Sequence, residues 1–284
     1  MIRNILVPTD FSNDAYNALF YATQLYKNQK CTFHILHAYD RKSHFKEEFR
    51  SGKATKKLQE FLSDRTAECL RETYHKIMGD TDKNPLHQFI TVPKNDSLEK
   101  AVKGYMALNP IDLIVMGTKG RTGAMDIFLG SNTIQMVKSK IDCPVLCIPK
   151  QIDYHPISQL GYITSFKHSL DKFTLSIVKS LSVSCEAALH IVHICDNENR
   201  SSSQEKNKAY LSDYFKDTCL RFHTIPYKRS KAKTVAEFAK THQIDLMAMC
   251  YYPHFFLEKL FREPVILDLS IYTEIPLLIL PSLE

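Results

Sequence analysis

A glycine-rich stretch in the first half of the chain carries residue types that could hold a phosphate group. It contains half of the chain's 8 glycines and ends in Gly130-Ser131, which predicts the start of a helix. Glycine allows the backbone to approach a ligand closely, and the free N–H groups at a helix start favour an anion. The spacing Gly117-x2-Gly120-x9-Gly130-Ser131 is neither a Walker A loop nor a GxGxxG loop. It still predicts a phosphate-binding loop.

The segments around this loop predict strands that alternate with helices. Short apolar runs at 5–8, 31–38, 88–92, 112–116 and 144–148 predict strands. Ser12 is a predicted helix cap, and so is Asp96 or Ser97; a charged segment from Arg41 to Leu58 leads into a long predicted helix that ends near Gly79. This alternation predicts an α/β fold with a mostly parallel, five-stranded sheet flanked by helices, as in Rossmann-like and flavodoxin-like domains. The ends of the strands at Pro8, Ala38 and Gly117 are expected to converge at one edge of that sheet.

The chain also repeats itself. Residues 32–40 resemble 188–196, residues 112–116 resemble 245–249, and residues 144–149 resemble 276–281, in the same order. We therefore predict two tandem domains, at residues 1–150 and 151–284.

The composition predicts a globular cytoplasmic protein. Hydrophobic residues make up 44% and charged residues 24%, and the net charge of +6 is too small to indicate nucleic-acid binding by itself. The sequence predicts neither a signal peptide nor a membrane span. The 8 cysteines include no CxxC pair, and we expect them to be reduced.

Two histidine pairs and two basic runs are weaker candidates. His34-x2-His37 and His190-x2-His193 could suggest a metal site, but residues three apart on a strand point to opposite faces. We predict core or strand-end histidines there, and no metal site. The basic runs at 53–57 and 228–233 are interpreted as solvated faces.

The loop spacing resembles the ATP-binding signature of the universal stress protein family. Four further segments agree with it: Ile-Leu-Val-Pro-Thr-Asp at the start, Leu-His-Ala at the end of the second strand, Asp-Leu-Ile-Val-Met-Gly before the loop, and Cys-Pro-Val-Leu at the last strand. The resemblance covers essentially the whole chain, in the tandem form of that family.

This resemblance implies an ATP site in the first domain, with Mg²⁺ between the triphosphate and the loop. Asp10, with Pro8 and Thr9 beside it, is implied to line the adenosine pocket, and Ala38 to lie near the adenine. Met116 and Gly117 are implied to border the ribose and the phosphates. The remaining implied phosphate-binding residues are Gly120, Arg121, Gly130, Ser131, Asn132 and Thr133.

The second domain is predicted to have lost this loop. Alignment of Asp112 with Asp245 places Cys250, Tyr251, Tyr252 and Pro253 where the first domain has 117–120, and Ser165 replaces Asp10. Proline removes an N–H donor, so Pro253 cannot serve as a glycine does. We predict a filled pocket there; a hydrophobic patch for a partner or another ligand is the alternative.

The resemblance implies a nucleotide-dependent regulatory protein of the stress response rather than a dedicated enzyme. A slow ATPase or nucleotidyl-transfer enzyme is one alternative, although Pro-Thr-Asp-Phe-Ser stands where related adenylyl-transferring enzymes have a histidine pair. An interaction module without a ligand is the other. Family members pair, so the two domains are expected to pair within the chain through 144–148 and 276–280. A homodimer is the other form of pairing, and the protein partner is unknown.

Overall fold

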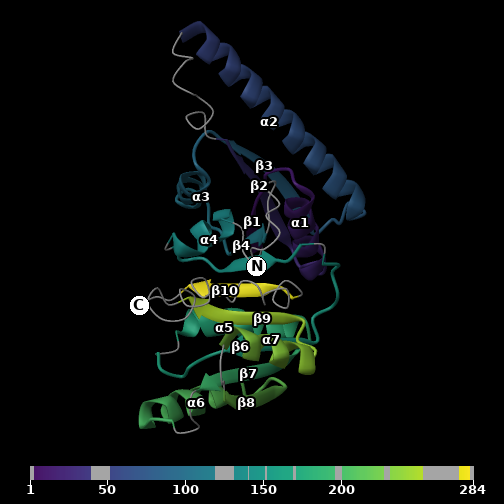
Figure 1. Ribbon diagram of the computed structural model, residues 1–284. Helices are drawn as coiled ribbons and strands as arrows, with labels where there is room; N and C mark the ends of the chain where they lie inside the picture. The colour runs from purple at the N-terminus through teal and green to yellow at the C-terminus, as the bar shows by residue number, and fades with distance from the viewer. Residues whose placement is uncertain are drawn as a thin grey trace. The chain divides into compact units, whose positions relative to one another are not determined.

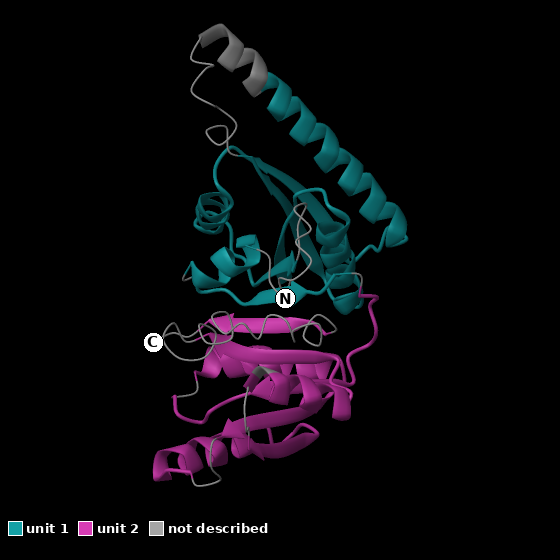
Figure 2. Ribbon diagram, viewed as in Figure 1, with its two compact units in different colours: residues 1–123, 129–151 teal, residues 124–128, 152–284 magenta. Residues whose placement is uncertain are grey.

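The computed structural model of the protein describes residues 3–39, 52–118, 131–139, 141–150, 152–168, 171–195, 200–226, 231–251 and 275–281. The chain divides into two compact units, residues 1–123 with 129–151 and residues 124–128 with 152–284 (Figure 2). Each unit is an α/β structure, which confirms the predicted fold class.

The first unit contains strands and helices in strict alternation (Figure 1). In chain order they are β1 (Arg3–Pro8), α1 (Asn13–Leu25), β2 (Cys31–Ala38), α2 (Gly52–Asp80), β3 (His87–Lys94), α3 (Leu98–Met106), β4 (Leu113–Gly117), α4 (Ser131–Lys138) and β5 (Val145–Ile148). The strand order is β3-β2-β1-β4-β5, and the pairings between neighbours in this order are parallel. Helices α1 and α2 lie on one face of the sheet, and α3 and α4 lie on the other (Figure 1).

The second unit repeats this arrangement. Its elements are β6 (Gln159–Ile163), α5 (Lys172–Ser184), β7 (Ala188–Cys195), α6 (Ser202–Tyr214), β8 (Leu220–Pro226), α7 (Lys231–Thr241), β9 (Leu246–Tyr251) and β10 (Leu277–Pro281). The order β10-β9-β6-β7-β8 matches that of the first unit, and these strands are also parallel.

Apolar strands and capped helices explain why these segments fold as they do. Residues 113–116 of β4 are all buried, as expected for a parallel strand covered on both faces. The Ser12 hydroxyl accepts a hydrogen bond from the Ala15 N–H at 3.2 Å, so the predicted cap of α1 is present. Ser97 is the N-cap residue of α3, but its side chain makes no capping bond.

Two aspartates confirm the internal repeat at the level of contacts. Asp112 Oδ2 accepts from the Asn4 N–H at 2.7 Å, which ties the start of β4 to β1. Asp245 Oδ2 accepts from the Ser158 N–H at 2.7 Å and from the Gln159 N–H at 2.8 Å, which ties β9 to β6 in the same way. The two halves therefore align residue by residue around these positions.

Within the described residues, no helix is both long enough and apolar enough to cross a membrane.

Candidate functional site

The carboxyl ends of β1, β2 and β4 meet at one edge of the first sheet. Because these strands are parallel and paired, Pro8, Ala38 and Gly117 end on the same side. In the sheet, β2 lies on one side of β1 and β4 lies on the other, so the strand order reverses at β1. Such a reversal of strand order opens a crevice at the carboxyl edge, where α/β sheets bind ligands. Thr9 and Asp10, which follow β1, and Thr118, which follows β4, lie at that edge.

The turn from β1 into α1 is held by its own side chains. Thr9 Oγ1 accepts from the Phe11 N–H at 3.0 Å, and Asp10 Oδ1 accepts from the Ser12 N–H at 3.0 Å. Phe11 has a φ of 63°, a conformation that a bulky residue adopts only when its surroundings enforce it. The half-buried carboxylate of Asp10 therefore has a fixed place at the edge of the sheet.

The other side of the crevice is built by Gly117 and α4. The Thr133 hydroxyl is buried and donates to the Gly117 carbonyl at 3.0 Å, which fastens the first turn of α4 to the end of β4. A Cβ on Gly117 would lie 2.8 Å from the Asp14 carbonyl oxygen, so glycine is needed there for α1 to pack against β4. Ser131 and Asn132 are exposed on the first turn of α4.

The other predicted site residues divide into two groups. Met116 is buried in the core, and Ala38 is half-buried beside Lys94 of β3. Three predicted phosphate-binding residues lie outside the described residues: Gly120, Arg121 and Gly130.

Two residues at this edge were not predicted as site residues. Thr118 follows Gly117 and is 2% exposed, and its hydroxyl has no hydrogen-bond partner among the described residues. His37 donates from Nδ1 to the Thr9 carbonyl at 2.7 Å, and its ring lies 4.3 Å from that of Phe11. Two features of the sequence could have indicated these residues. Thr118 directly follows the loop glycine, and His37 lies in the Leu-His-Ala segment.

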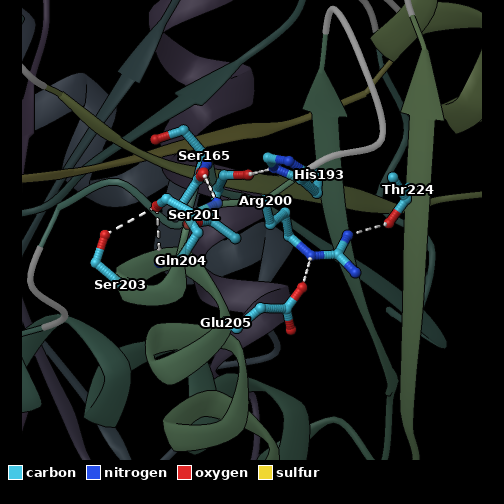
Figure 3. Close-up of polar contacts among 9 residues, drawn as sticks. Ser165, His193, Arg200, Ser201, Ser203, Gln204, Glu205 and Thr224 are labelled. Atoms are coloured by element: carbon cyan, nitrogen blue, oxygen red, sulfur yellow. Dashed lines mark hydrogen bonds and ion pairs between the residues drawn. The ribbon is translucent and has the colours of Figure 1, made fainter.

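At the corresponding edge of the second unit, several described side chains are hydrogen-bonded to one another (Figure 3). Gln204 donates to the carbonyl of Ser165, the residue in place of Asp10, at 2.9 Å. Arg200 donates to Thr224 Oγ1 at 3.1 Å and pairs with Glu205 at 2.5 Å, which lowers the pKa of the Glu205 carboxyl. These described polar groups are therefore bonded to one another.

The two His-x2-His pairs behave as the strand geometry predicts. His34 contacts the Tyr105 hydroxyl at 2.8 Å, whereas His37 contacts the backbone of Thr9. His193 donates to the Thr164 carbonyl at 3.1 Å, and burial lowers its pKa although this bond partly raises it. His190 points to other partners, so neither pair converges on one ion.

Comparison with protein families gives a match over the first half of the chain. The model described as "Universal stress protein family" matches residues 1–149. The universal stress protein MJ0531 of Methanocaldococcus jannaschii is 30% identical over 152 residues, which are 53% of this chain and 84% of the relative.

Comparison with solved structures covers both units. A universal stress protein from Archaeoglobus fulgidus matches with a TM-score of 0.71 and 14% identity, over 98% of this chain and 96% of the other. A putative universal stress protein from Pseudomonas aeruginosa matches with a TM-score of 0.52 and 14% identity, over 99% and 93%. At this level of identity the likeness shows the fold, and it extends over the second unit as well as the first.

Proposed function

The chain belongs to the universal stress protein family, and on that premise we propose that its first unit binds ATP with Mg²⁺ and acts as a nucleotide-dependent regulatory protein in a stress response. The second unit, which repeats the fold, is proposed to bind no nucleotide. The proposal places the ligand at the carboxyl edge of the first sheet, between β1 and β4.

The observation that carries this proposal is the bond between Thr133 and Gly117. It holds the N-terminal turn of α4 at the crevice where the strand order reverses. The first N–H groups of a helix have no partner within the helix, and the helix dipole adds positive potential there. A phosphate group beside Ser131 and Asn132 would satisfy those donors.

The surrounding residues support the proposal of a nucleotide. The buried Thr118 hydroxyl lacks a hydrogen-bond partner among the described residues and could supply one more bond at this edge. Asp10 stands on the opposite side of the crevice, where it suits the adenosine. Thr133 already donates to Gly117, so we assign it the positioning of α4 rather than a bond to phosphate. Gly120, Arg121 and Gly130 complete the loop in this proposal.

We predict that ATP with Mg²⁺ saturates the full chain at one nucleotide per chain. The carboxyl edge of the first unit has the start of α4 and Asp10. The corresponding edge of the second unit has Ser165 and side chains that are already bonded to one another. Isothermal titration calorimetry gives the stoichiometry, and chromatography of the supernatant from heat-denatured protein identifies any co-purified nucleotide. Two nucleotides per chain would contradict the assignment of the second unit. Absence of binding would favour an interaction module.

We also predict that ATP is not turned over at an enzymatic rate. Asp10 accepts a hydrogen bond from the Ser12 N–H within the turn, and its proposed place is beside the adenosine, away from the terminal phosphate. A steady-state phosphate-release assay should therefore give a turnover below about 1 s⁻¹, the low end for ordinary enzymes. A faster rate that an Asp10→Asn variant loses would favour the ATPase alternative.

A further inference from the structure

Three histidines from separate elements of the second unit converge on one point. His190 lies on β7, His223 on β8, and His242 directly after α7. One ring nitrogen from each lies within 4.8 Å of the other two. The rings of His190 and His223 are stacked at an interplanar angle of 3°, and the ring of His242 lies 4.7 Å from that of His223.

Hydrogen bonds direct a lone pair of His190 into the cluster. His190 Nε2 lies 2.7 Å from Gln159 Oε1, and because an amide oxygen only accepts, Nε2 carries the ring proton. His190 Nδ1 is then unprotonated and accepts a hydrogen bond from His223 Nε2 at 3.1 Å, so a metal ion would take the place of the proton between these two nitrogens. Histidines that bind metals share this feature, with the outer N–H donated to an oxygen and the inner nitrogen unprotonated.

The first unit has the anchored histidine without the cluster. His34 corresponds to His190, and its Nε2 lies 3.4 Å from the amide oxygen of Asn4, the counterpart of Gln159. Its Nδ1, however, is occupied by the Tyr105 hydroxyl at 2.8 Å.

The other positions also differ between the units. Strand register and the alignment of Asp112 with Asp245 make Val92 and Asn109 the counterparts of His223 and His242. Phe238 stands where the first unit has Tyr105. The second unit therefore has two additional imidazoles, and His190 Nδ1 contacts one of them where His34 Nδ1 contacts a tyrosine hydroxyl.

The cluster has a buried end and an accessible end. His190 is 1% exposed, whereas His223 and His242 are half-buried and line a pocket of about 980 Å³. Lys233 and Glu237 line the same pocket with opposite charges. The positive charge of Arg221, two residues before His223, opposes a cation, so imidazole coordination has to supply the affinity. The pocket gives an ion a route to the cluster and leaves room for a water ligand.

We propose that His190, His223 and His242 form a binding site for a divalent transition metal ion, with Zn²⁺ as the expected occupant and water as the fourth ligand. Imidazole nitrogen suits zinc, and three protein ligands with water in the fourth position are characteristic of zinc sites that keep one position open. Bonds of about 2.0–2.1 Å place nitrogens around a tetrahedral zinc ion roughly 3.3 Å apart. The 3.1 Å pair already meets this spacing, and the widest separation must shorten by roughly 1.5 Å.

The test uses the full chain, purified without a polyhistidine tag and stripped of metal. Equilibrium dialysis against ZnCl₂ with elemental analysis should give one tightly bound Zn²⁺ per chain. His223→Gln and His242→Gln should each weaken binding by at least about 100-fold, and Gln159→Leu by about 10-fold, since outer partners typically contribute 10–100-fold. His75→Gln, at an exposed histidine of α2, should leave the affinity unchanged.

Co²⁺ gives a second readout, because its visible absorption reports tetrahedral nitrogen coordination directly. That band should appear in the wild type and in His75→Gln, and should be absent from both cluster variants. Circular dichroism shows whether the variants are folded. If His223→Gln is not folded, the metal affinity of the wild type is compared with that of His242→Gln, whose substitution lies beyond the end of a helix. Failure of the wild type to bind one Zn²⁺, or equal binding by the folded cluster variants, would overturn the proposal.

Discussion

Gly130→Val is expected to weaken ATP binding by at least about 100-fold while the circular dichroism spectrum stays unchanged. In the proposed site this glycine lets the backbone before α4 approach the phosphates, and a branched side chain would hold them away. A hydrogen bond to a charged group contributes about 1.5–3 kcal/mol, and 100-fold corresponds to about 2.8 kcal/mol, so losing one or two such bonds suffices. Calorimetric titration with ATP and Mg²⁺ measures the change.

Two further variants make this result specific. Ser131→Asp places a carboxylate at the exposed first residue of α4, where it stabilises the helix but repels phosphate, so binding should fall in a well-folded protein. Tyr251→Ala, at the end of β9 in the second unit, should leave the affinity unchanged. If both first-unit variants bound ATP as well as the wild type, the loop would not be the phosphate site.

The fold could be predicted from the sequence because most of its strands are buried on both faces. Such strands appear as short apolar runs, and the five strands predicted in the first half begin and end within two residues of those observed. The start of α2 was harder to place, because the charged segment predicted to precede it extends to Leu58 whereas the helix begins at Gly52. A helix that exposes much of its surface leaves a weaker apolar pattern than a buried strand.

The details of the site depend on contacts that residue spacing does not encode. Nothing in the sequence distinguishes the positive φ of Phe11, since glycine is the residue that normally signals this conformation. The buried bond from Thr133 to Gly117 joins α4 to the end of β4, a contact that the residue type alone does not indicate. The sequence pattern predicts which edge of the sheet carries the candidate site. Which polar groups at that edge can bind a ligand depends on how the side chains pack.

The histidine cluster could not be predicted from the spacing of residues along the sequence. The sequence directs attention to His190-x2-His193, which lie on one strand and face different partners. The residues that do gather come from neighbouring strands and a helix end, separated by loops. Only the register between β7 and β8 and the end point of α7 bring His223 and His242 to His190.

Gly117→Ala is expected to destabilise the first unit by about 2 kcal/mol, because overpacking a tight contact typically costs 1–3 kcal/mol. The added Cβ would lie 2.8 Å from the carbonyl oxygen of Asp14 and 3.0 Å from its carbonyl carbon. Both are backbone atoms in the first turn of α1, so they cannot move aside as the tip of a flexible side chain could. Urea denaturation followed by circular dichroism should show a lower midpoint with an unchanged slope.

Gly104→Ala supplies the matched control for this prediction, as the same substitution in the same unit. Gly104 lies within α3, and a Cβ added there would meet no atom within 4 Å. Because glycine inside a helix is less favourable than alanine by roughly 0.5–1 kcal/mol, this variant should be more stable than the wild type. The two substitutions should therefore shift the urea midpoint in opposite directions. A Gly117→Ala variant at least as stable as the wild type would show that α1 and β4 are not packed as closely as this contact requires, and that the glycine there serves only the ligand.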